Sequence, residues 1–328
     1  MRGKGVHYDT GTAVSDGWSR ETFDPVDVRR DMRIIARELH CTAVRVTGGD
    51  PGRLAVAAEE AAAAGLEVWF SPFPCDLTAG ELLPLLEECA ERAEALRREG
   101  AEVVLVTGGE LSLFARGFLP GDDFLSRIAL VAGRGPELPG LLRAVPERVN
   151  AFLAEAVAAV RTRFGGKVTY AAVPFERVDW TPFDYVAADA YRAAGNAATF
   201  REEIRALHRH GRPVAITEFG CCTYRGAADR GGTGFLIVDR TQEPWRLNGR
   251  YERDEQGQAA YLRDLLRVFD EEGVDTAFWY TFAGYRYPHH PDPRYDLDLA
   301  SYGLVRIDQD LSLHPKAAFH ALATAYDS

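Results

Sequence analysis

The sequence lacks any block of basic residues and any long apolar run. Its 49 acidic side chains outnumber its 38 lysines and arginines, and the formal net charge is -11. A nucleic-acid interface needs clustered basic groups that neutralise phosphates. A membrane-spanning helix needs about 20 consecutive apolar residues. The sequence therefore predicts neither nucleic acid nor a membrane as a partner.

Cysteine is also scarce. The chain has five cysteines, which is an odd number, and their spacing is not that of metal ligands. This pattern favours reduced thiols over disulfides. The N-terminus runs straight into a predicted strand without an apolar signal segment, so we expect a cytoplasmic protein. Cys221 and Cys222 are adjacent, and they are interpreted either as a reactive pair or as small side chains that line a pocket wall.

The chain is long enough for a large hydrophobic core. It has 328 residues, of which 46% are hydrophobic. A chain of this length fits one α/β barrel better than two separate domains. We therefore expect residues 1–328 to form a single catalytic domain.

Apolar strand segments alternate with amphipathic helix segments along the whole chain. Asp24-Pro25 and Asp50-Pro51 are helix-start signals, with an aspartate N-cap followed by proline. The predicted strands are 5–8, 41–46, 66–71, 103–107, 167–173, 183–189, 213–217 and 275–281. The predicted helices are 25–39, 51–64, 78–100, 146–164, 199–210, 254–272 and 316–326. Eight strand units predict an α/β fold, a (β/α)8 TIM barrel, with long loops 111–144, 221–253 and 282–314 after strands 4, 7 and 8.

Two of the predicted strands each deliver a glutamate to the carboxyl end. Glu218 follows the four apolar or β-branched residues 214–217, and Glu110 follows 103–107 and two glycines. In a parallel α/β protein the ligand lies outside the carboxyl ends of the strands. Either glutamate alone could cap a loop or pair with an arginine. Two of them in one barrel can act as an acid/base and nucleophile pair.

With these two motifs the chain resembles the clan of retaining glycoside hydrolases built on a (β/α)8 barrel. In that clan the acid/base glutamate ends strand four and the nucleophile ends strand seven, and the strand count puts Glu110 and Glu218 at those places. The resemblance implies retaining hydrolysis of a glycosidic bond in a small-molecule glycoside. It implies no metal and no organic cofactor.

The resemblance also implies roles for residues around the two glutamates. Arg45 matches an arginine that supports the nucleophile, and Trp279 matches an aromatic floor for the sugar. Asp189 and Tyr191 match a polar residue and a tyrosine that hydrogen-bonds the nucleophile. His7, near the end of the first strand, either touches the ligand or makes a structural hydrogen bond.

One position departs from the clan. Gly109 stands where an asparagine usually holds the sugar 2-hydroxyl. That contact is either lost or supplied by Asp189 or His7, which would suit a deoxy or otherwise unusual glycoside. Two alternatives stay open: a lyase or isomerase that uses the same glutamates for proton transfer, and a non-catalytic carbohydrate-binding barrel.

Two further groups of polar residues have weaker interpretations. Glu176, after the fifth strand, is a reserve candidate for substrate binding. The third long loop combines two histidines with three aspartates, which is interpreted either as a metal site or, because of the irregular spacing, as a solvated surface. These residues are His289, His290, Asp292, Asp296 and Asp298.

Overall fold

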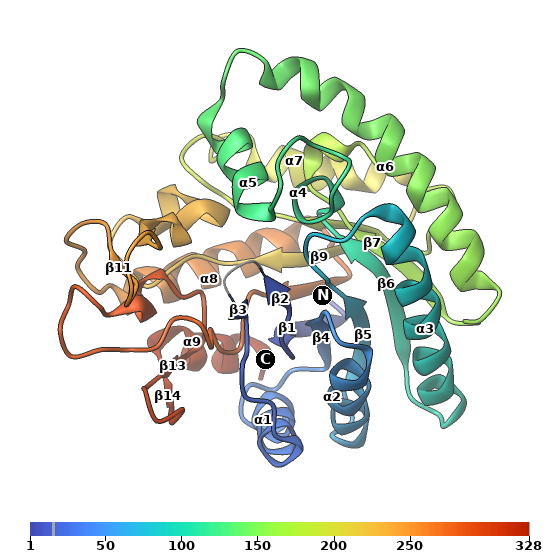
Figure 1. Ribbon diagram of the computed structural model, residues 1–328. Coiled ribbons are helices and arrows are strands. Elements are labelled where there is room, and N and C mark those ends of the chain that lie inside the picture. The colour runs from blue at the N-terminus through green and yellow to red at the C-terminus, as the bar shows by residue number, and fades with distance from the viewer. Residues whose placement is uncertain (15–16, 328) are drawn as a thin grey trace.

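A computed structural model describes residues 1–14 and 17–327, and these form a parallel β-barrel surrounded by helices (Figure 1). The eight barrel strands are β1 (Gly3–Asp9), β4 (Ala43–Gly48), β5 (Glu67–Pro72), β6 (Val103–Gly109), β7 (Lys167–Ala171), β8 (Val186–Asp189), β9 (Val214–Phe219) and β12 (Thr276–Trp279). The predicted (β/α)8 fold is confirmed, and each predicted strand overlaps one of these.

The strands close into a barrel because the first and last pair with each other. The hydrogen-bonded order is β7-β6-β5-β4-β1-β12-β9-β8, so β1 lies between β4 and β12. The remaining seam, between β7 and β8, is held by a parallel bridge between Ala172 and Ala188. The Asp189 N–H also donates to the Ala172 carbonyl at 2.9 Å. All eight carboxyl ends therefore meet at one mouth.

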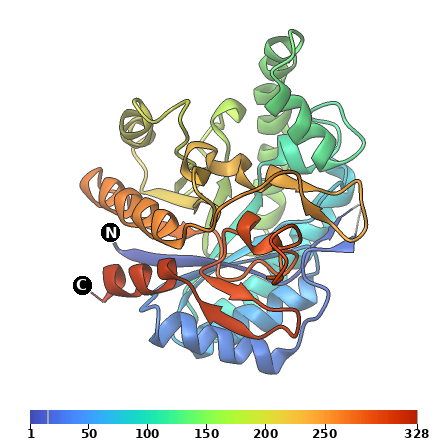
Figure 2. The same ribbon diagram turned by 90° about the vertical axis from the view of Figure 1, so that its left-hand side faces the viewer.

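Helices cover the outside of this barrel. They are α1 (Pro25–Arg37), α2 (Pro51–Ala63), α3 (Ala79–Arg98), α6 (Leu138–Arg161), α7 (Phe200–Leu207), α8 (Glu255–Glu271) and α9 (Ala317–Tyr326). The predicted caps are present, since Asp24 and Asp50 accept hydrogen bonds from backbone N–H groups in the first turns of α1 and α2. The two chain ends lie close together (Figure 2), and Lys4 Nζ donates to the Tyr326 carbonyl at 2.8 Å.

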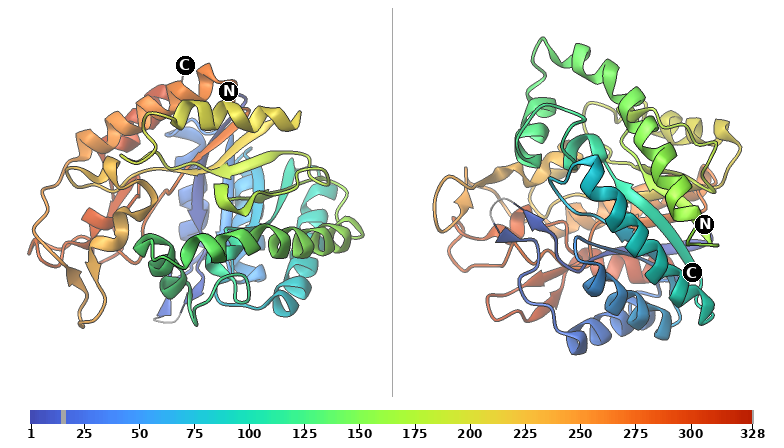
Figure 3. Two further views of the ribbon diagram at one scale, coloured as in Figure 1. Left: turned by 90° about the horizontal axis from the view of Figure 1, so that it is seen from above. Right: turned by 45° about the vertical axis from the view of Figure 1, so that its right-hand side comes forward.

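The segment after β6 differs from the predicted loop. Residues 111–144 contain α4 (Leu111–Phe114), α5 (Phe124–Gly133) and the beginning of α6. Pro146 was expected to open a helix, but it lies inside α6. A proline inside a helix removes one backbone hydrogen bond and crowds the carbonyl four residues earlier, but the buried Val145 and Val149 keep this helix packed on its neighbours. Helices α3 and α6 run side by side on the barrel surface (Figure 3, right).

Short elements fill the other connections. They are the strands β2 (Ala13–Val14), β3 (Gly17–Trp18), β10 (Val238–Asp239), β11 (Arg246–Leu247), β13 (Val305–Ile307) and β14 (Leu313–Pro315), and the 3₁₀ turns η1 (Pro174–Glu176), η2 (His208–His210), η3 (Ala227–Asp229), η4 (Gly231–Ile237) and η5 (Leu297–Ala300). Turn η1 stands in place of a fifth helix, and the sequence analysis gave no helix between the predicted strands 167–173 and 183–189. Among the described residues, no helix combines the length and apolar character required to cross a bilayer.

The barrel interior is a packed core rather than a channel. Trp69 lies at its centre, with ring centroids 5.1 Å from Tyr185 and 5.0 Å from Phe278. Small residues such as Ala43 and Ala215 complete the inner cluster. Side chains that point outward from the same strands join the larger core beneath the helices. Because the barrel is filled, a ligand is expected at the mouth above this cluster, where the carboxyl ends of the strands lie.

Candidate active site

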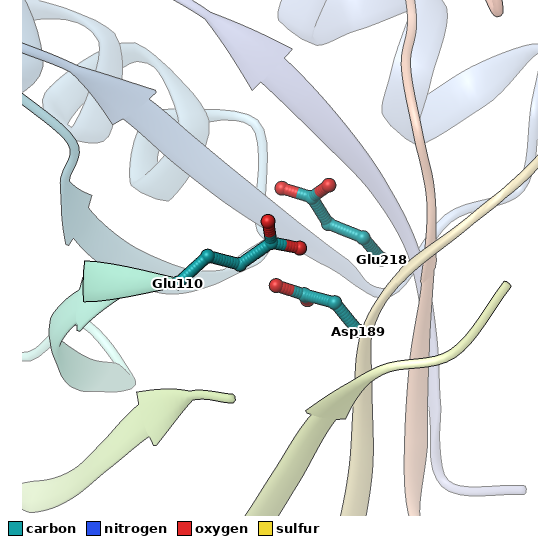
Figure 4. A group of neighbouring side chains, drawn as sticks. All are labelled: Glu110, Asp189 and Glu218. Atoms are coloured by element: carbon teal, nitrogen blue, oxygen red, sulfur yellow. The ribbon is translucent and has the colours of Figure 1, made fainter. Parts of the chain in front are cut away.

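Three carboxyl groups meet at the mouth of the barrel (Figure 4). Glu110 follows β6, Asp189 ends β8 and Glu218 lies near the end of β9. One oxygen of each lies within 4.8 Å of the corresponding oxygens of the other two. The strand-end pattern thus brings together both glutamates that the sequence singled out, with Asp189 as a third acid.

A β-bulge turns Glu218 toward this mouth. Ala188 of β8 pairs with Ile216, but Asp189 pairs with Glu218, so β9 has one extra residue here. The same irregularity occurs against β12 on its other side. Ala215 points into the barrel, and strict alternation from it would turn residue 218 outward. The bulge breaks the alternation, as bulges beside active sites do, and puts Glu218 on the inner side.

A second bulge precedes Glu110. Val106 of β6 pairs with Thr169 and Gly109 pairs with Ala171, so β6 also has one residue more than its neighbour. Glu110 then adopts a left-handed conformation, with φ 45° and ψ 43°. Its N–H donates to the Ala171 carbonyl at 2.8 Å. A non-glycine residue in this region costs about 1–3 kcal/mol and persists where its surroundings hold it.

Glu218 is held by a cation and a phenol. Arg45 Nη1 donates to Oε1 at 3.0 Å, and the Tyr191 hydroxyl donates to Oε2 at 2.9 Å. The side chain of Arg45 is 0% exposed and that of Glu218 is 12% exposed. Burial and the charge of Asp189 raise the pKa of Glu218 to about 8, while Arg45 and Tyr191 act in the opposite direction. The structure therefore puts Arg45 and Tyr191 where the resemblance places the partners of a nucleophile.

Glu110 and Asp189 form a carboxyl pair. Burial, followed by the negative charges of Asp189 and Glu218, raises the pKa of Glu110 well above its usual value. Burial also raises the pKa of Asp189, but Arg45 opposes this from 3.6 Å. Both oxygens of Asp189 are buried and make no hydrogen bond with the described residues. The negative charges of Asp189 and Glu218 beside Glu110 therefore favour the protonated form of Glu110.

His7 lines the mouth as a neutral ring. Its Nε2 lies 2.7 Å from Thr47 Oγ1 and its Nδ1 lies 3.0 Å from Thr281 Oγ1. Burial and the nearby charge of Arg45 lower the pKa of His7 well below its usual value. His7 Nε2 is 4.0 Å from Glu218 Oε1. Of the two interpretations of His7, the structural hydrogen bond is the one present, and contact with a ligand stays a prediction.

Trp279 does not face the mouth, so the expected aromatic floor requires correction. Its side chain is 0% exposed and packs edge-on against Phe219 in the outer core. Phe278 points into the barrel, and alternation along β12 therefore sends Trp279 outward and Tyr280 inward. The ring of Tyr280 lies 4.6 Å from that of His7. Sequence analysis missed Tyr280, although alternation from Phe278 could have found it.

The surroundings of residue 109 explain why a glycine occupies this position. A Cβ at this position would lie 3.1 Å from Arg45 Nη2, 3.1 Å from a ring carbon of Phe73 and 3.3 Å from the Ala171 Cβ. An asparagine here would push against the guanidinium that binds Glu218. Any contact to a sugar 2-hydroxyl must therefore come from another residue.

The remaining polar candidates have structural partners. Glu176 is 0% exposed and lies beneath α4, so it is not available to a substrate. His289 Nδ1 lies 2.9 Å from Asp296, which also binds Arg253 at 2.9 Å. Asp298 is 1% exposed and pairs with Lys316 at 3.2 Å. Asp296 and Asp298 thus belong to a buried ion-pair network, whereas Asp292 is exposed, in line with the solvated-surface interpretation.

Among the described residues, the carboxyl triad is the one group with metal-ligand spacing. Carboxylate oxygens suit hard divalent cations. Arg45 already supplies one positive charge at 3.0 Å from Glu218, and the Glu110 proton removes one negative charge.

Cys221 and Cys222 are each 1% exposed, and burial raises the pKa of both thiols, so they are not reactive thiolates.

Solved carbohydrate-active enzymes share this fold, whereas no protein-family model and no curated protein sequence matches the chain. A GH113 β-1,4-mannanase aligns with a TM-score of 0.65 and 15% identity over 100% of this chain and 99% of its own. The GH113 β-mannanase of Alicyclobacillus acidocaldarius, in complex with ManMIm, aligns with a TM-score of 0.64 and 17% identity over 99% of this chain and 97% of its own. The β-glucuronidase of Parabacteroides merdae aligns with a TM-score of 0.58 and 11% identity, and the alignment covers 99% of this chain but 36% of its own. Likeness at such identities establishes the fold, a (β/α)8 TIM barrel.

Proposed function

We propose that the protein is a retaining glycoside hydrolase in which Glu218 is the nucleophile and Glu110 the acid/base. The observation that carries this proposal is the spacing of their carboxyl oxygens, within 4.8 Å of one another. Retaining enzymes hold the two carboxyl groups about 5–5.5 Å apart, whereas inverting enzymes leave about 6.5–9.5 Å for a water molecule. The spacing therefore favours direct attack by one carboxylate.

The partners of the two glutamates support their different roles. Glu218 accepts hydrogen bonds from Arg45 and Tyr191, which stabilise the ionised form that attacks. Glu110 sits among negative charges that keep its proton in place. Glu110 would protonate the leaving oxygen while Glu218 forms an ester with the anomeric carbon. Glu110 would then accept a proton from the water that cleaves this ester.

The substrate class follows from the same proposal. We propose a small-molecule glycoside, which is consistent with the names of the mannanases and the glucuronidase that share the fold. The net charge of -11 argues against nucleic acid and anionic membrane surfaces as partners. All five cysteines are free thiols, which supports the cytoplasmic location that we propose.

The alternatives make different demands on the site. A non-catalytic barrel would have its carboxylates far apart or locked to arginines, but the oxygens converge and Glu110 has no arginine partner among the described residues. A lyase or isomerase would use the same pair for proton transfer. Gly109, which lacks the side chain that the clan uses for the sugar 2-hydroxyl, is the observation that favours this second candidate.

The test is turnover of activated aryl glycosides, including 2-deoxy sugars. Wild type, Glu218→Ala and Glu110→Ala are compared, with Glu102→Ala as a control at the exposed opposite end of β6. We expect Glu218→Ala to lose activity and azide to restore it with formation of the inverted glycosyl azide. Glu110→Ala should keep its first step for leaving groups that need no protonation. If the wild type cleaves no glycoside in the panel, hydrolysis is rejected and proton transfer becomes the leading candidate.

A further inference from the structure

The mechanism proposed above gives no role to Glu176, one of several buried acids among the described residues. Glu176, in η1, is 0% exposed and has a donor on each oxygen. Oε1 accepts from the Ser112 N–H at 2.9 Å and from the Ser112 hydroxyl at 2.7 Å. Oε2 accepts from the Tyr170 hydroxyl at 2.9 Å and from the Val173 N–H at 3.3 Å. Four donors around one carboxyl group favour its ionised form.

These bonds hold the backbone that carries Glu110. The N–H of Glu110 donates to the Ala171 carbonyl at 2.8 Å, and the N–H of Leu111 donates to the Tyr170 hydroxyl at 2.7 Å. The next N–H along the chain is the one that Glu176 binds. Three successive N–H groups are therefore fixed by one neighbouring segment, 170–176. Such a support is what the left-handed conformation of Glu110, with φ 45°, requires.

We propose that Glu176 is a positioning residue for Glu110, since it anchors the 110–112 turn and places a second buried charge directly behind the acid/base. This inference rests on the proposed role of Glu110. It concerns a residue that touches neither the sugar nor the bond that is cleaved.

The electrostatic effect has a definite sign. The acidic groups that face Glu110 are Asp189 from β8, Glu218 from β9 and Glu176 from η1, and after burial all three raise the pKa of Glu110. The phenols of Tyr170 and Tyr280 also lie near Glu110. Burial raises the pKa of Glu176 itself to about 7, against the four donors. Its repulsion therefore acts from about neutral pH upward, the range in which Glu110 has to keep its proton. Neutralising residue 176 should make Glu110 lose its proton at lower pH.

The test is a graded series of variants. Glu176→Gln removes the charge and keeps the size, and Ser112→Ala removes one donor and so raises the pKa of Glu176. Glu155→Gln removes an exposed charge from α6 as a control. We expect the descending limb of kcat/KM against pH to move to lower pH for Glu176→Gln, less for Ser112→Ala and not at all for the control. The loss should be greatest for glycosides with poor leaving groups, since these depend on the acid.

A purely structural role would give a different result. It predicts a uniform loss of rate at every pH, with the limb unmoved and no dependence on the leaving group. Either of those outcomes would overturn the inference. Ser112→Ala keeps the test decisive if Glu176→Gln does not fold.

A second readout needs no activity. The carboxyl carbons of glutamate are labelled with ¹³C, the Glu110 signal is assigned with Glu110→Gln, and its titration midpoint is followed in wild type and Glu176→Gln. We expect a lower midpoint in Glu176→Gln, and equal midpoints would refute the coupling. If the wild type hydrolyses no glycoside, the proposed function fails while this titration still decides the inference.

Discussion

If the proposed hydrolysis takes place, Tyr191→Phe should change the pH at which the activity appears. The Tyr191 hydroxyl donates to Glu218 Oε2 at 2.9 Å, while Arg45 holds the other oxygen at 3.0 Å. Phenylalanine keeps the ring, which packs edge-on against Tyr302 with centroids 6.0 Å apart. The substitution thus removes one donor and little else. Because that bond stabilises the carboxylate, its loss raises the pKa of Glu218.

The size of the effect follows from the geometry. Hydrogen bonds to charged groups contribute about 1.5–3 kcal/mol. The Glu218 side chain is 12% exposed, so water can partly replace the lost donor and the lower end applies. This corresponds to about one pH unit. Burial raises the pKa of Glu218 to about 8 in the wild type, so at pH 7 the ionised fraction should fall about tenfold, and the loss should shrink as the pH rises.

The assay is kcat/KM against pH with an aryl glycoside that the wild type cleaves. A nucleophile must be ionised, so the ascending limb reports Glu218, and we expect it about one unit higher in Tyr191→Phe. Tyr251→Phe, which removes a phenol bonded to Asn248 away from the carboxylates, is the matched control. A loss that is equal at every pH, with the limb unmoved, would show that Tyr191 does not tune Glu218.

Three further substitutions test the packing and the charges. Trp69→Ala empties the centre of the barrel, where the side chain is 0% exposed, and should cost about 3–5 kcal/mol in urea unfolding. Lys316→Ala removes one partner of Asp298, both side chains being 1% exposed, and should cost about 3 kcal/mol, the low end for a broken buried pair, because Arg253 remains. Gly109→Ala places a Cβ 3.1 Å from Arg45 Nη2. It should cost about 1–3 kcal/mol and raise the ascending limb of the pH profile, and an unchanged profile would contradict the contact.

The fold could be predicted because each unit carries its own local signals. Asp24 and Asp50 cap helices directly before a proline, and both helices begin where expected. The apolar runs of the buried parallel strands are equally local, and the strand boundaries differ by a few residues at most. Helix α5 was missed although Asp123 caps it by accepting from the Ser126 N–H, because Arg127 is the one buried residue of α5 and the helix therefore has no apolar stripe that faces a core. Pro146 inside α6 also gave a false start signal.

Part of the site could be predicted for a related reason. Residues at the carboxyl ends of parallel strands share one mouth, so Arg45, Asp189 and Tyr191 lie beside Glu218, as their strand positions indicate. The prediction of Trp279 as an aromatic floor was wrong because its residue type was given more weight than the side of the strand on which alternation places it. The prediction of Glu176 as a substrate-binding residue was wrong because its burial and its four donors come from segments that meet only in the folded chain.

The two bulges show why strand position alone could not settle the orientation of the glutamates. Alternation from Ala215 predicts that Glu218 points outward, and only the extra residue of β9 against both neighbours reverses this. Bulge formation depends on the register of adjacent strands, which no stretch of β9 encodes by itself. The extra residue of β6 precedes Glu110 in the same way. Each proposed catalytic acid thus departs from the regular strand pairing, and the surrounding hydrogen bonds must hold it there. The residues to vary are therefore the donors around Glu218 and the residues of segment 170–176 that support Glu110.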